Sequence, residues 1–524
     1  MDTKALRQKI LDLAIRGKLV PQDPNDEPAS VLLERIREQK QQMVKEGKLK
    51  KKDIKNDSVI FVGEDNLHYE KSADGSVKCI EDEIPFELPE GWAWTRLGCI
   101  TDVIQYGLSN SAESTGDYRL LRITDIQNGC VNWDTVPFTY TDEPEKYLLH
   151  KDDIVFARTG ATVGKSFLIT DLPYVSVYAS YLIRIRLING ISANYIYHFF
   201  NSYCYWEQVT DKSVGVGQPN CNGTALKELF IPLPSQAEQN RIVPVADNLL
   251  KIADVITSER ESLSELIQTT KSKILDLAIR GKLVPQNSDD EPASVLLERI
   301  KAEKEELIKQ GKIKRDKKES IIFKGEDNSY YEKIGSEVRC IDSEIPFDLP
   351  ESWMFARLKH IGEVIGGGTP KTSIDEYWDG DIPWLTPADL SGYENMHIST
   401  GARTITELGL KSSSAQLLSE NSILYSSRAP IGYIAIAANP ISTNQGFKSV
   451  VPYNSLMSPY LYYCLKARTS DIVRRATGTT FKEISGSEMA ETIVPLPPIN
   501  EQQRIFDKAT KLLEILSTIE KSLN

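Results

Sequence analysis

Three features are scarce or missing in this chain of 524 residues: histidine, paired cysteines and long apolar runs. Only five histidines occur. None has an H-E-x-x-H or comparable spacing, so we expect no metal site. The seven cysteines are odd in number and include no C-x-x-C pair, which argues against a disulfide framework and a zinc site.

No uncharged stretch is long enough to span a membrane, and the first nine residues are charged where a signal peptide would be apolar. We therefore expect a cytoplasmic protein with no membrane contact. With 40% hydrophobic and 26% charged residues, the composition is that of an ordinary folded chain of two to four domains. The formal charge of −12 argues against non-specific coating of nucleic acid, although local basic surfaces remain possible.

The chain contains an internal duplication. KILDLAIRGKLVPQ at residues 9–22 recurs letter for letter at residues 273–286. Two further blocks recur in the same order: DEPASVLLERI at 26–36 and 290–300, and EIPFELPEGW at 83–92, which returns as EIPFDLPESW at 344–353. Between these blocks the two halves differ widely, which predicts a fixed scaffold with two variable inserts. Cys79 and Cys340 are repeat equivalents, and we expect both to be small buried residues.

The scaffold has the pattern of long helices. One apolar row follows heptad spacing at Ile242, Leu249, Ile256, Leu263 and Leu277, and a companion row follows at Val245, Ile252 and Leu266. A helix over residues 236–280 would be a rod about 68 Å long. The N-terminal and C-terminal segments each repeat half of this rod. We therefore expect a pseudo-two-fold molecule whose chain ends meet and whose rods pack antiparallel.

The two inserts, residues 92–232 and 353–495, alternate short β-like runs with turns, and residues 195–208 have the pattern of an aromatic-rich helix. The predicted fold class is α+β: two globular α/β domains separated by long antiparallel coiled-coil helices, with an internal pseudo-two-fold repeat. The predicted domains are a helical region with a hairpin extension at 1–83, the first insert at 84–234, the central helix with its own hairpin extension at 235–343, the second insert at 344–497, and a C-terminal helix at 498–524.

One segment approaches a phosphate-binding loop. GATVGKS at residues 160–166 ends correctly, but the motif needs glycine where Thr159 stands, and the SFLI that follows has the pattern of a strand. A P-loop nucleotide-binding protein using residues 160–166 stays open as one alternative function. A coiled-coil scaffold that binds proteins and no DNA is the other.

Several phrases together resemble a known family. They are LDLAIRGKLVPQ with DEPASVLLERI, the insert endings PLP-x-x-x-EQ-x-RI, and GGGTPKT…EYWDGDIPWLTPADL at residues 366–390. These phrases are similar to the specificity subunits of type I restriction-modification systems, and the likeness covers nearly the whole chain. The resemblance implies a non-catalytic subunit that binds double-stranded DNA, with each insert acting as a target-recognition domain for one half of an asymmetric bipartite site.

The resemblance also implies protein partners. Two modification subunits would dock on the helical repeats and methylate adenine with S-adenosylmethionine, and restriction subunits would add an ATP-dependent motor and nuclease that needs Mg. We expect these cofactors on the partners and none on this chain. Asn439-Pro440-Ile441-Ser442 is not the Asn-Pro-Pro-aromatic motif of an adenine methyltransferase, which agrees with methylation by a partner.

Direct readout of bases in the major groove needs bidentate or amide side chains on loops. The candidates are Arg158, Thr159, Lys165, Gln218 and Asn220 in the first insert, and Lys371, Arg428, Gln445, Lys448 and Lys482 in the second. For each of them an ordinary surface role stays the alternative, because such residues are common on all protein surfaces. The prediction of DNA binding therefore depends on no single one.

Overall fold

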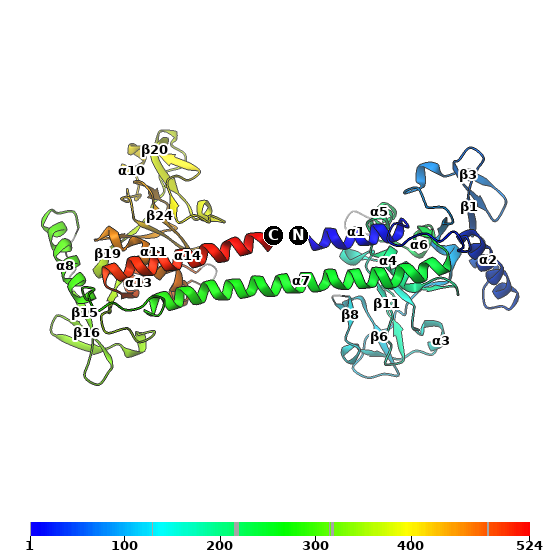
Figure 1. Ribbon diagram of the computed structural model, residues 1–524, viewed down its shortest axis with the longest axis horizontal. Coiled ribbons are helices and arrows are strands. Elements are labelled where there is room, and N and C mark those ends of the chain that lie inside the picture. The colour runs from blue at the N-terminus through cyan, green and yellow to red at the C-terminus, as the bar shows by residue number, and fades with distance from the viewer. Residues whose placement is uncertain are drawn as a thin grey trace. The chain divides into compact units, whose positions relative to one another are not determined.

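The computed structural model describes residues 2–127, 129–213, 220–313, 315, 319–478 and 482–523. It divides into two compact units, unit 1 (Met1–Arg260) and unit 2 (Glu261–Asn524), each with one scaffold half and one insert (Figure 1). The predicted mixture of helix and sheet with one long central helix is confirmed. Among the described helices, none has the length and apolar character needed to cross a membrane.

The frame of unit 1 consists of α1 (Thr3–Ile15), α2 (Ala29–Lys45) and the first half of α7 (Gln236–Ile279). Helix α1 lies alongside α7 in the antiparallel direction (Figure 1), because Arg7 contacts Asp254 while Gln22 donates a hydrogen bond to Glu238 at 2.6 Å. Helix α1 ends at Ile15, two residues before Gly17. Gly17 has a φ of +62°, a conformation that favours glycine.

The frame of unit 2 repeats this arrangement with α8 (Ala293–Lys309), α14 (Ile499–Leu523) and the second half of α7. Helix α14 also runs antiparallel to α7. Gln286, just after α7, donates to Glu501 at 2.6 Å, and Gln268 donates to Glu520 at 2.7 Å. Each terminal segment therefore packs against the half of α7 that belongs to its own unit.

The buried rows of α7 differ from the prediction. Ile242 is buried, but Leu263 and the whole companion row of Val245, Ile252 and Leu266 are exposed. A row one residue later is buried instead, at Ala246, Ala253, Ile267 and Ile274. The heptad spacing was right, but the prediction was wrong for Leu263 of the first row and for the whole companion row. The prediction selected the larger apolar residues, but alanines let two helices approach more closely and are buried in their place.

Each frame carries a small antiparallel sheet of three strands. These are β1 (Ser58–Val62), β2 (His68–Ser72) and β3 (Val77–Cys79) in unit 1, and β15 (Ser320–Lys324), β16 (Tyr330–Ile334) and β17 (Glu337–Cys340) in unit 2. Cys79 and Cys340 are exposed on the outer strands, so the prediction that they are buried was wrong. Cys79 pairs with Tyr69, on the face opposite Ile60, and Ile60 packs against the core.

The insert of unit 1 is a layered α/β domain. Its strands are β5 (Thr101–Tyr106), β10 (Ile154–Ala157), β11 (Ser166–Leu168) and β13 (Leu182–Leu187) in the order β11-β10-β13-β5, then β6 (Tyr118–Leu121), β9 (Phe138–Thr139) and β12 (Ser176–Tyr178) in the order β12-β6-β9, and the hairpin β7 (Ile126–Gln127) with β8 (Cys130–Val131). Ile154 and Phe156 face the helical core, while Val155 and Ala157 face the core shared with β6 and β12.

The helices of this insert are α3 (Pro144–Tyr147), α4 (Ala193–Phe200), α5 (Tyr203–Lys212) and α6 (Gly223–Lys227). The single helix predicted over residues 195–208 is two helices, α4 and α5. It breaks at Asn201 because the Ser202 hydroxyl caps a new helix by accepting from the Tyr205 amide at 3.3 Å. Strands β4 (Ala93–Arg96) and β14 (Phe230–Leu233) pair with each other and so join the two ends of the insert.

The insert of unit 2 repeats this plan with different side chains. Its strands are β19 (Gly362–Gly366), β21 (His397–Ile398), β23 (Ile423–Ser427), β24 (Ile431–Ala437) and β26 (Lys448–Pro452) in the order β19-β26-β23-β24-β21, then β20 (Trp378–Leu385), β22 (Arg403–Ile405) and β25 (Ser442–Thr443) in the order β22-β20-β25, and the closing pair β18 (Met354–Arg357) and β27 (Ile493–Leu496). Its helices are α9 (Leu358–Ile361), α10 (Glu407–Lys411), α11 (Ser458–Ala467), α12 (Thr469–Arg475) and α13 (Gly486–Ala490).

Candidate nucleic-acid interface

Most of the predicted contact residues lie at one end of the larger sheet in each insert. In unit 1, Arg158, Thr159 and Lys165 follow strand β10 on residues 158–165, which we call the β10 loop. In unit 2, Arg428 follows strand β23 on residues 428–430, which we call the β23 loop, and Lys448 begins the neighbouring strand β26. Both loops come directly after fully buried strands. Loops held by such strands are common places for binding residues because the sheet fixes their position.

In unit 1 the β10 loop lies against the segment that precedes α6. The Arg158 carbonyl accepts from the Cys221 amide at 3.0 Å, and Thr159 forms an isolated β-bridge with Asn220. Arg158 stacks its guanidinium 4.8 Å from the ring centroid of Tyr106. The structure therefore brings Arg158, Thr159 and Asn220 together.

Two other candidates of unit 1 have different outcomes. Lys165 is exposed at the end of the same loop, where its amide donates to the Thr162 carbonyl at 3.0 Å. Gln218 lies outside the described residues. The segment that resembles a P-loop contains the short 3-10 turn Gly160–Thr162 and then strand β11, as predicted from SFLI. The helix that a P-loop requires at that point is absent from these described residues.

In unit 2 a carboxylate joins two of the predicted cations. Glu483 Oε1 lies 3.4 Å from the ammonium of Lys448, and Glu483 Oε2 lies 3.7 Å from the guanidinium of Arg428. Lys448 also donates to the carbonyl of Gln445 at 3.4 Å, and the side chain of Gln445 is hydrogen-bonded to the hydroxyl of Thr369. Arg428, Gln445 and Lys448 thus form one polar cluster.

The remaining candidates of unit 2 lie at the edge of this cluster. Lys482 is exposed and precedes Glu483 in the chain. Lys371 is exposed on the loop that carries Thr369, and its carbonyl accepts from the Trp378 indole at 3.3 Å. No interaction between Lys371 and the cluster is found within the described residues. Its place in the interface stays a prediction.

The strand registers show that the two loops occupy equivalent places. Ile154 begins β10 and pairs with Ile185, as Ile423 begins β23 and pairs with Val450. The bridge between Thr159 and Asn220 corresponds to a bridge between Arg428 and Glu483. The Ile484 amide also donates to the Ser427 carbonyl at 3.1 Å, as Cys221 does to Arg158.

At these equivalent places the side chains differ in chemistry. Following the same registers, Lys448 of unit 2 stands where unit 1 has Ile183, and Gly366 stands where unit 1 has Tyr106. Unit 1 therefore offers an arginine beside an aromatic ring and two neutral polar groups. Unit 2 offers two cations around a carboxylate. Side chains of this kind match the donors and acceptors on base edges.

Three members of these clusters were missed in the sequence: Tyr106, Thr369 and Glu483. Tyr106 accepts from the amide of Gly223 at 2.9 Å, which fixes its ring beside Arg158. For Glu483 a signal was present. It occupies the repeat position of Asn220, which was already a candidate, within the parallel phrases that end each insert.

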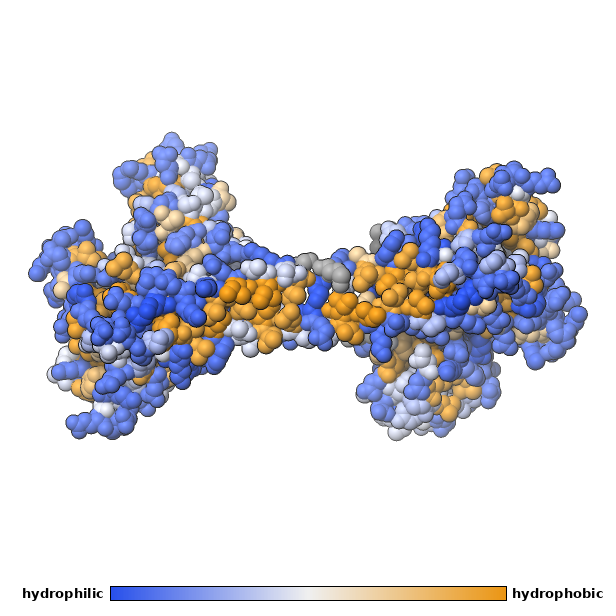
Figure 2. All heavy atoms as spheres, in the orientation of Figure 1, coloured by the Kyte–Doolittle hydropathy of each residue, from blue (hydrophilic) through white to orange (hydrophobic). Residues whose placement is uncertain are grey.

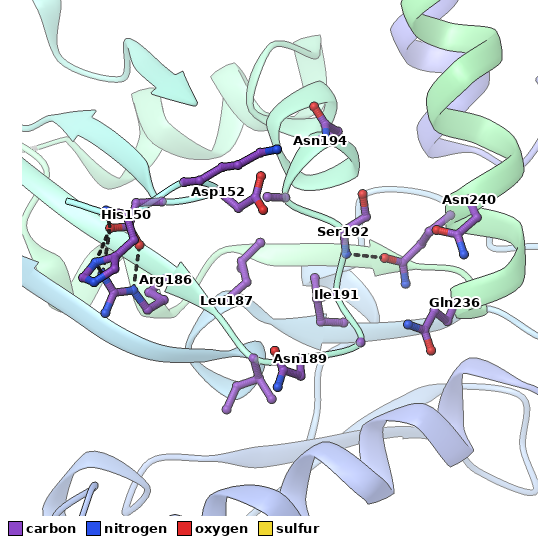
Figure 3. Close-up of a pocket in the computed structure, with 16 residues that line it drawn as sticks. His150, Asp152, Arg186, Leu187, Asn189, Ile191, Ser192, Asn194, Gln236 and Asn240 are labelled. Carbon is purple, nitrogen blue, oxygen red and sulfur yellow. Dashed lines mark hydrogen bonds and ion pairs between the residues drawn. The ribbon is translucent and has the colours of Figure 1, made fainter. Parts of the chain in front are cut away.

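A cavity of about 550 Å³ lies at the opposite end of β10 in unit 1 (Figure 3). Several of its polar groups are engaged with one another. Arg186 forms two hydrogen bonds to Asp153 at 2.7 and 2.8 Å, which raises the pKa of the guanidinium, and the Ser192 amide donates to Gln239 of α7 at 2.8 Å. The bond from Ser192 to Gln239 ties the insert to the frame. No group of three or more acidic, histidine or cysteine side chains among the described residues could hold a metal ion.

The fold and the two loops define a class of protein: a pair of related α/β domains, each held on a helical frame and each presenting polar and charged side chains on a loop. A family model described as the type I restriction modification DNA specificity domain matches residues 89–265 and 350–524. The matches span well over half of the chain. The chain therefore belongs to this family, and its two inserts are the DNA-recognition domains of a type I specificity subunit.

Individual relatives agree with this assignment. The chain is 26% identical to the EcoAI specificity subunit of Escherichia coli, over 98% of this chain and 89% of that protein. It is 48% identical to the MjaIX specificity subunit of Methanocaldococcus jannaschii, over 30% of this chain and 37% of that protein. A solved chain from a study of complex assembly and conformational transition of the type I restriction-modification system shares the fold, with a TM-score of 0.50, 18% identity, and coverage of 84% and 94%.

Proposed function

We propose that this chain reads an asymmetric, bipartite site in double-stranded DNA, one half with each recognition domain. The observation that carries the proposal is the pair of equivalent loops with unlike chemistry. Thr159 and Asn220 are neutral hydrogen-bonding groups, whereas Arg428 and Glu483 at the same places are charged. Equivalent positions give both domains the same reach, and different donors and acceptors select different bases.

An exchange of one domain tests this proposal. Replacing residues 92–232 with the corresponding insert of another family member should change one half of the recognised sequence and leave the other half unaltered. The methylated adenines of cells that express the hybrid, mapped across the genome, report both halves at once. A change in both halves would contradict independent reading by the two domains.

The partners would dock on the frame, in two copies because the frame is duplicated. Apolar side chains remain exposed along the rods, at Val245, Ile252 and Val255 in unit 1 and at Leu263, Leu266, Ile515 and Ile519 in unit 2. Figure 2 shows apolar surface gathered along these helices within each unit. Exposed apolar surface of this kind is typical of protein interfaces. We assign these surfaces to modification subunits.

Methylation and DNA cleavage would then be carried out by the partners. In this proposal the modification subunits bind S-adenosylmethionine, the restriction subunits bind ATP and Mg, and this chain contributes specificity without catalysis. Titration of the purified chain with S-adenosylmethionine should give no heat of binding, whereas the complex with modification subunits should bind it. Binding by the isolated chain would contradict this division of roles.

The spacer between the half-sites would be set by α7. The helix has 44 residues, and a rigid helix fixes the distance between what its two halves carry. Inserting one helical turn near residue 260 should shift the preferred spacer to a longer one, which selection from duplexes of graded spacer length would detect. An unchanged spacer would contradict the role of α7 as a ruler.

The two alternative functions have simple tests. Specific binding to duplex DNA should weaken linearly with salt on logarithmic axes, because phosphate contacts release counterions. A scaffold that binds proteins alone would not bind duplex DNA. ATP titration addresses a P-loop at residues 160–166, and no binding is expected because a strand follows this segment.

A further inference from the structure

Glu483 is unusual for a residue at a DNA interface, since its carboxylate would repel phosphate. Its side chain is 40% exposed, and its backbone is fixed on two sides. It bridges to Arg428, and it exchanges two hydrogen bonds with Thr477, at 2.8 and 3.1 Å. Its two cationic neighbours, Lys448 and Arg428, explain why a carboxylate is held at this position.

The carboxylate divides its oxygens between these neighbours. Oε1 faces Lys448 at 3.4 Å, and Oε2 faces Arg428 at 3.7 Å. The longer contact is electrostatic and uses none of the guanidinium N–H groups as hydrogen-bond donors. Arg428 is thereby oriented, and among the described residues no hydrogen bond occupies its guanidinium. A free arginine would instead sample many rotamers and lose that orientation.

The surroundings of Lys448 support the same reading. Its side chain is only 15% exposed and passes between two glycines, because a β-carbon added at Gly366 or Gly486 would meet Lys448 Cδ at 3.9 or 3.8 Å. Lys448 is therefore packed below the surface and helps to hold Glu483. Of the two cations of the trio, Arg428, with 37% of its side chain exposed, is the one that can reach a base.

We propose that Glu483 is a positioning and specificity-determining residue of the second recognition domain. It holds Arg428 for a bidentate contact with a guanine in the major groove, the commonest specific contact of arginine with DNA. It also repels phosphate, which keeps Arg428 from settling on the backbone, where a contact carries no sequence information. The inference rests on the proposed function of reading a bipartite site.

Selection from a random duplex library tests the inference with the full-length chain. The wild-type chain should enrich a bipartite sequence with a guanine in one half. Glu483→Gln should lower the preference for that guanine about 10-fold, since a good bidentate pair discriminates by about 1–3 kcal/mol. The slope of log affinity against log salt should steepen by about 0.9, the change expected for one added phosphate contact.

Two further variants keep the test decisive. Glu483→Asp keeps the charge on a shorter side chain and should retain part of the guanine preference. Glu488→Gln is the matched control, because Glu488 is an exposed carboxylate on α13 paired with Arg475 and lies outside the trio. Its enriched sequence should equal that of the wild type.

The outcomes separate the inference from the function on which it rests. If the wild-type chain enriches no sequence, the proposed function fails. If the wild type enriches a bipartite sequence and Glu483→Gln enriches the same one with the same salt slope, the inference alone is overturned. Loss of the entire second half-site in both Glu483 variants would mark a folding role and would also overturn it.

Discussion

In unit 1 the indole of Trp92 donates to Glu238 at 2.8 Å, and in unit 2 the indole of Trp353 donates to Glu501 at 3.0 Å. Gln22 and Gln286 complete the two networks at the same distance of 2.6 Å. The two frames thus repeat their buried polar contacts almost atom for atom. Such contacts tolerate little change, because a buried group that loses its partner is costly.

The contacts between insert and frame follow another rule. His198 Nε2 of α4 lies 2.8 Å from Asp247 of α7, whereas the corresponding pair in unit 2 is Tyr463 and Thr510, hydrogen-bonded at 2.9 Å. The place of the contact is kept, while its chemistry is exchanged. The frame therefore specifies where each insert packs. The side chains that make the contact, and those on the insert loops, can differ between the two units.

The largest effect should come from breaking the shared network. Glu238→Ala should destabilise unit 1 by about 2–3 kcal/mol, because the buried indole and amide donors lose their acceptor. Glu501→Ala should have an equal effect on unit 2. Urea unfolding followed by amide hydrogen exchange in each unit measures both. Clearly unequal losses would contradict the equivalence of the two frames.

A smaller effect should follow from transplanting the charged pair between loops. Thr159→Arg combined with Asn220→Glu gives the β10 loop the bridge pair of the β23 loop. The base preference of the first half-site should change by about 10-fold at one position, while the second half-site stays unaltered. Library selection reports both half-sites. A change confined to the second half-site would contradict the assignment of the β10 loop to the first one.

The contact pair of His198 and Asp247 should make unit 1 sensitive to pH. Burial lowers the pKa of His198, so the unfolded chain takes up the proton first as the pH falls through about 6.5. Stability of unit 1 is therefore lost between that pH and the lower pKa of the folded state. The corresponding contact of unit 2 should be unaffected in this window, because burial raises the pKa of Tyr463.

Hydrogen exchange in α4 and α11 at pH 7.5 and 5.5, corrected for intrinsic rates, checks this difference. His198→Tyr with Asp247→Thr should remove the sensitivity of unit 1, and Tyr463→His with Thr510→Asp should transfer it to unit 2. An equal response of both helices in the wild type would count against the assignment to His198.

The smallest effect concerns the cysteines. Cys79 and Cys340 are exposed at equivalent places and should react with iodoacetamide at similar rates. Burial raises the pKa of Cys204 and Cys221 to about 11 and that of Cys464 to about 12, so these thiols should stay unmodified at pH 7.5. Mass spectrometry of peptides measures each site. Labelling of Cys340 but not of Cys79 would show that the two small sheets differ.

Much of this fold could be predicted from the sequence because its signals are local or repeated. The heptad spacing of α7 and the strand β11 at SFLI both depend on residues near one another in the chain. Because the scaffold is duplicated, each of its patterns occurs twice in the sequence and could be checked against its copy. The family resemblance was found in the repeated phrases and the insert endings, and the match over residues 89–265 and 350–524 confirms the family.

Other features depended on which distant segments become neighbours. Ala246 and Ala253 are buried although larger apolar residues of α7 are exposed, and Cys79 is exposed because it lies on the face of its sheet opposite Ile60. Glu483 becomes significant only when Arg428 after β23, Lys448 of β26 and Thr477 after α12 converge on it. Periodicity and propensity determine what each segment becomes. Tertiary packing alone decided which charges meet, because charges interact through distance in space and not along the chain.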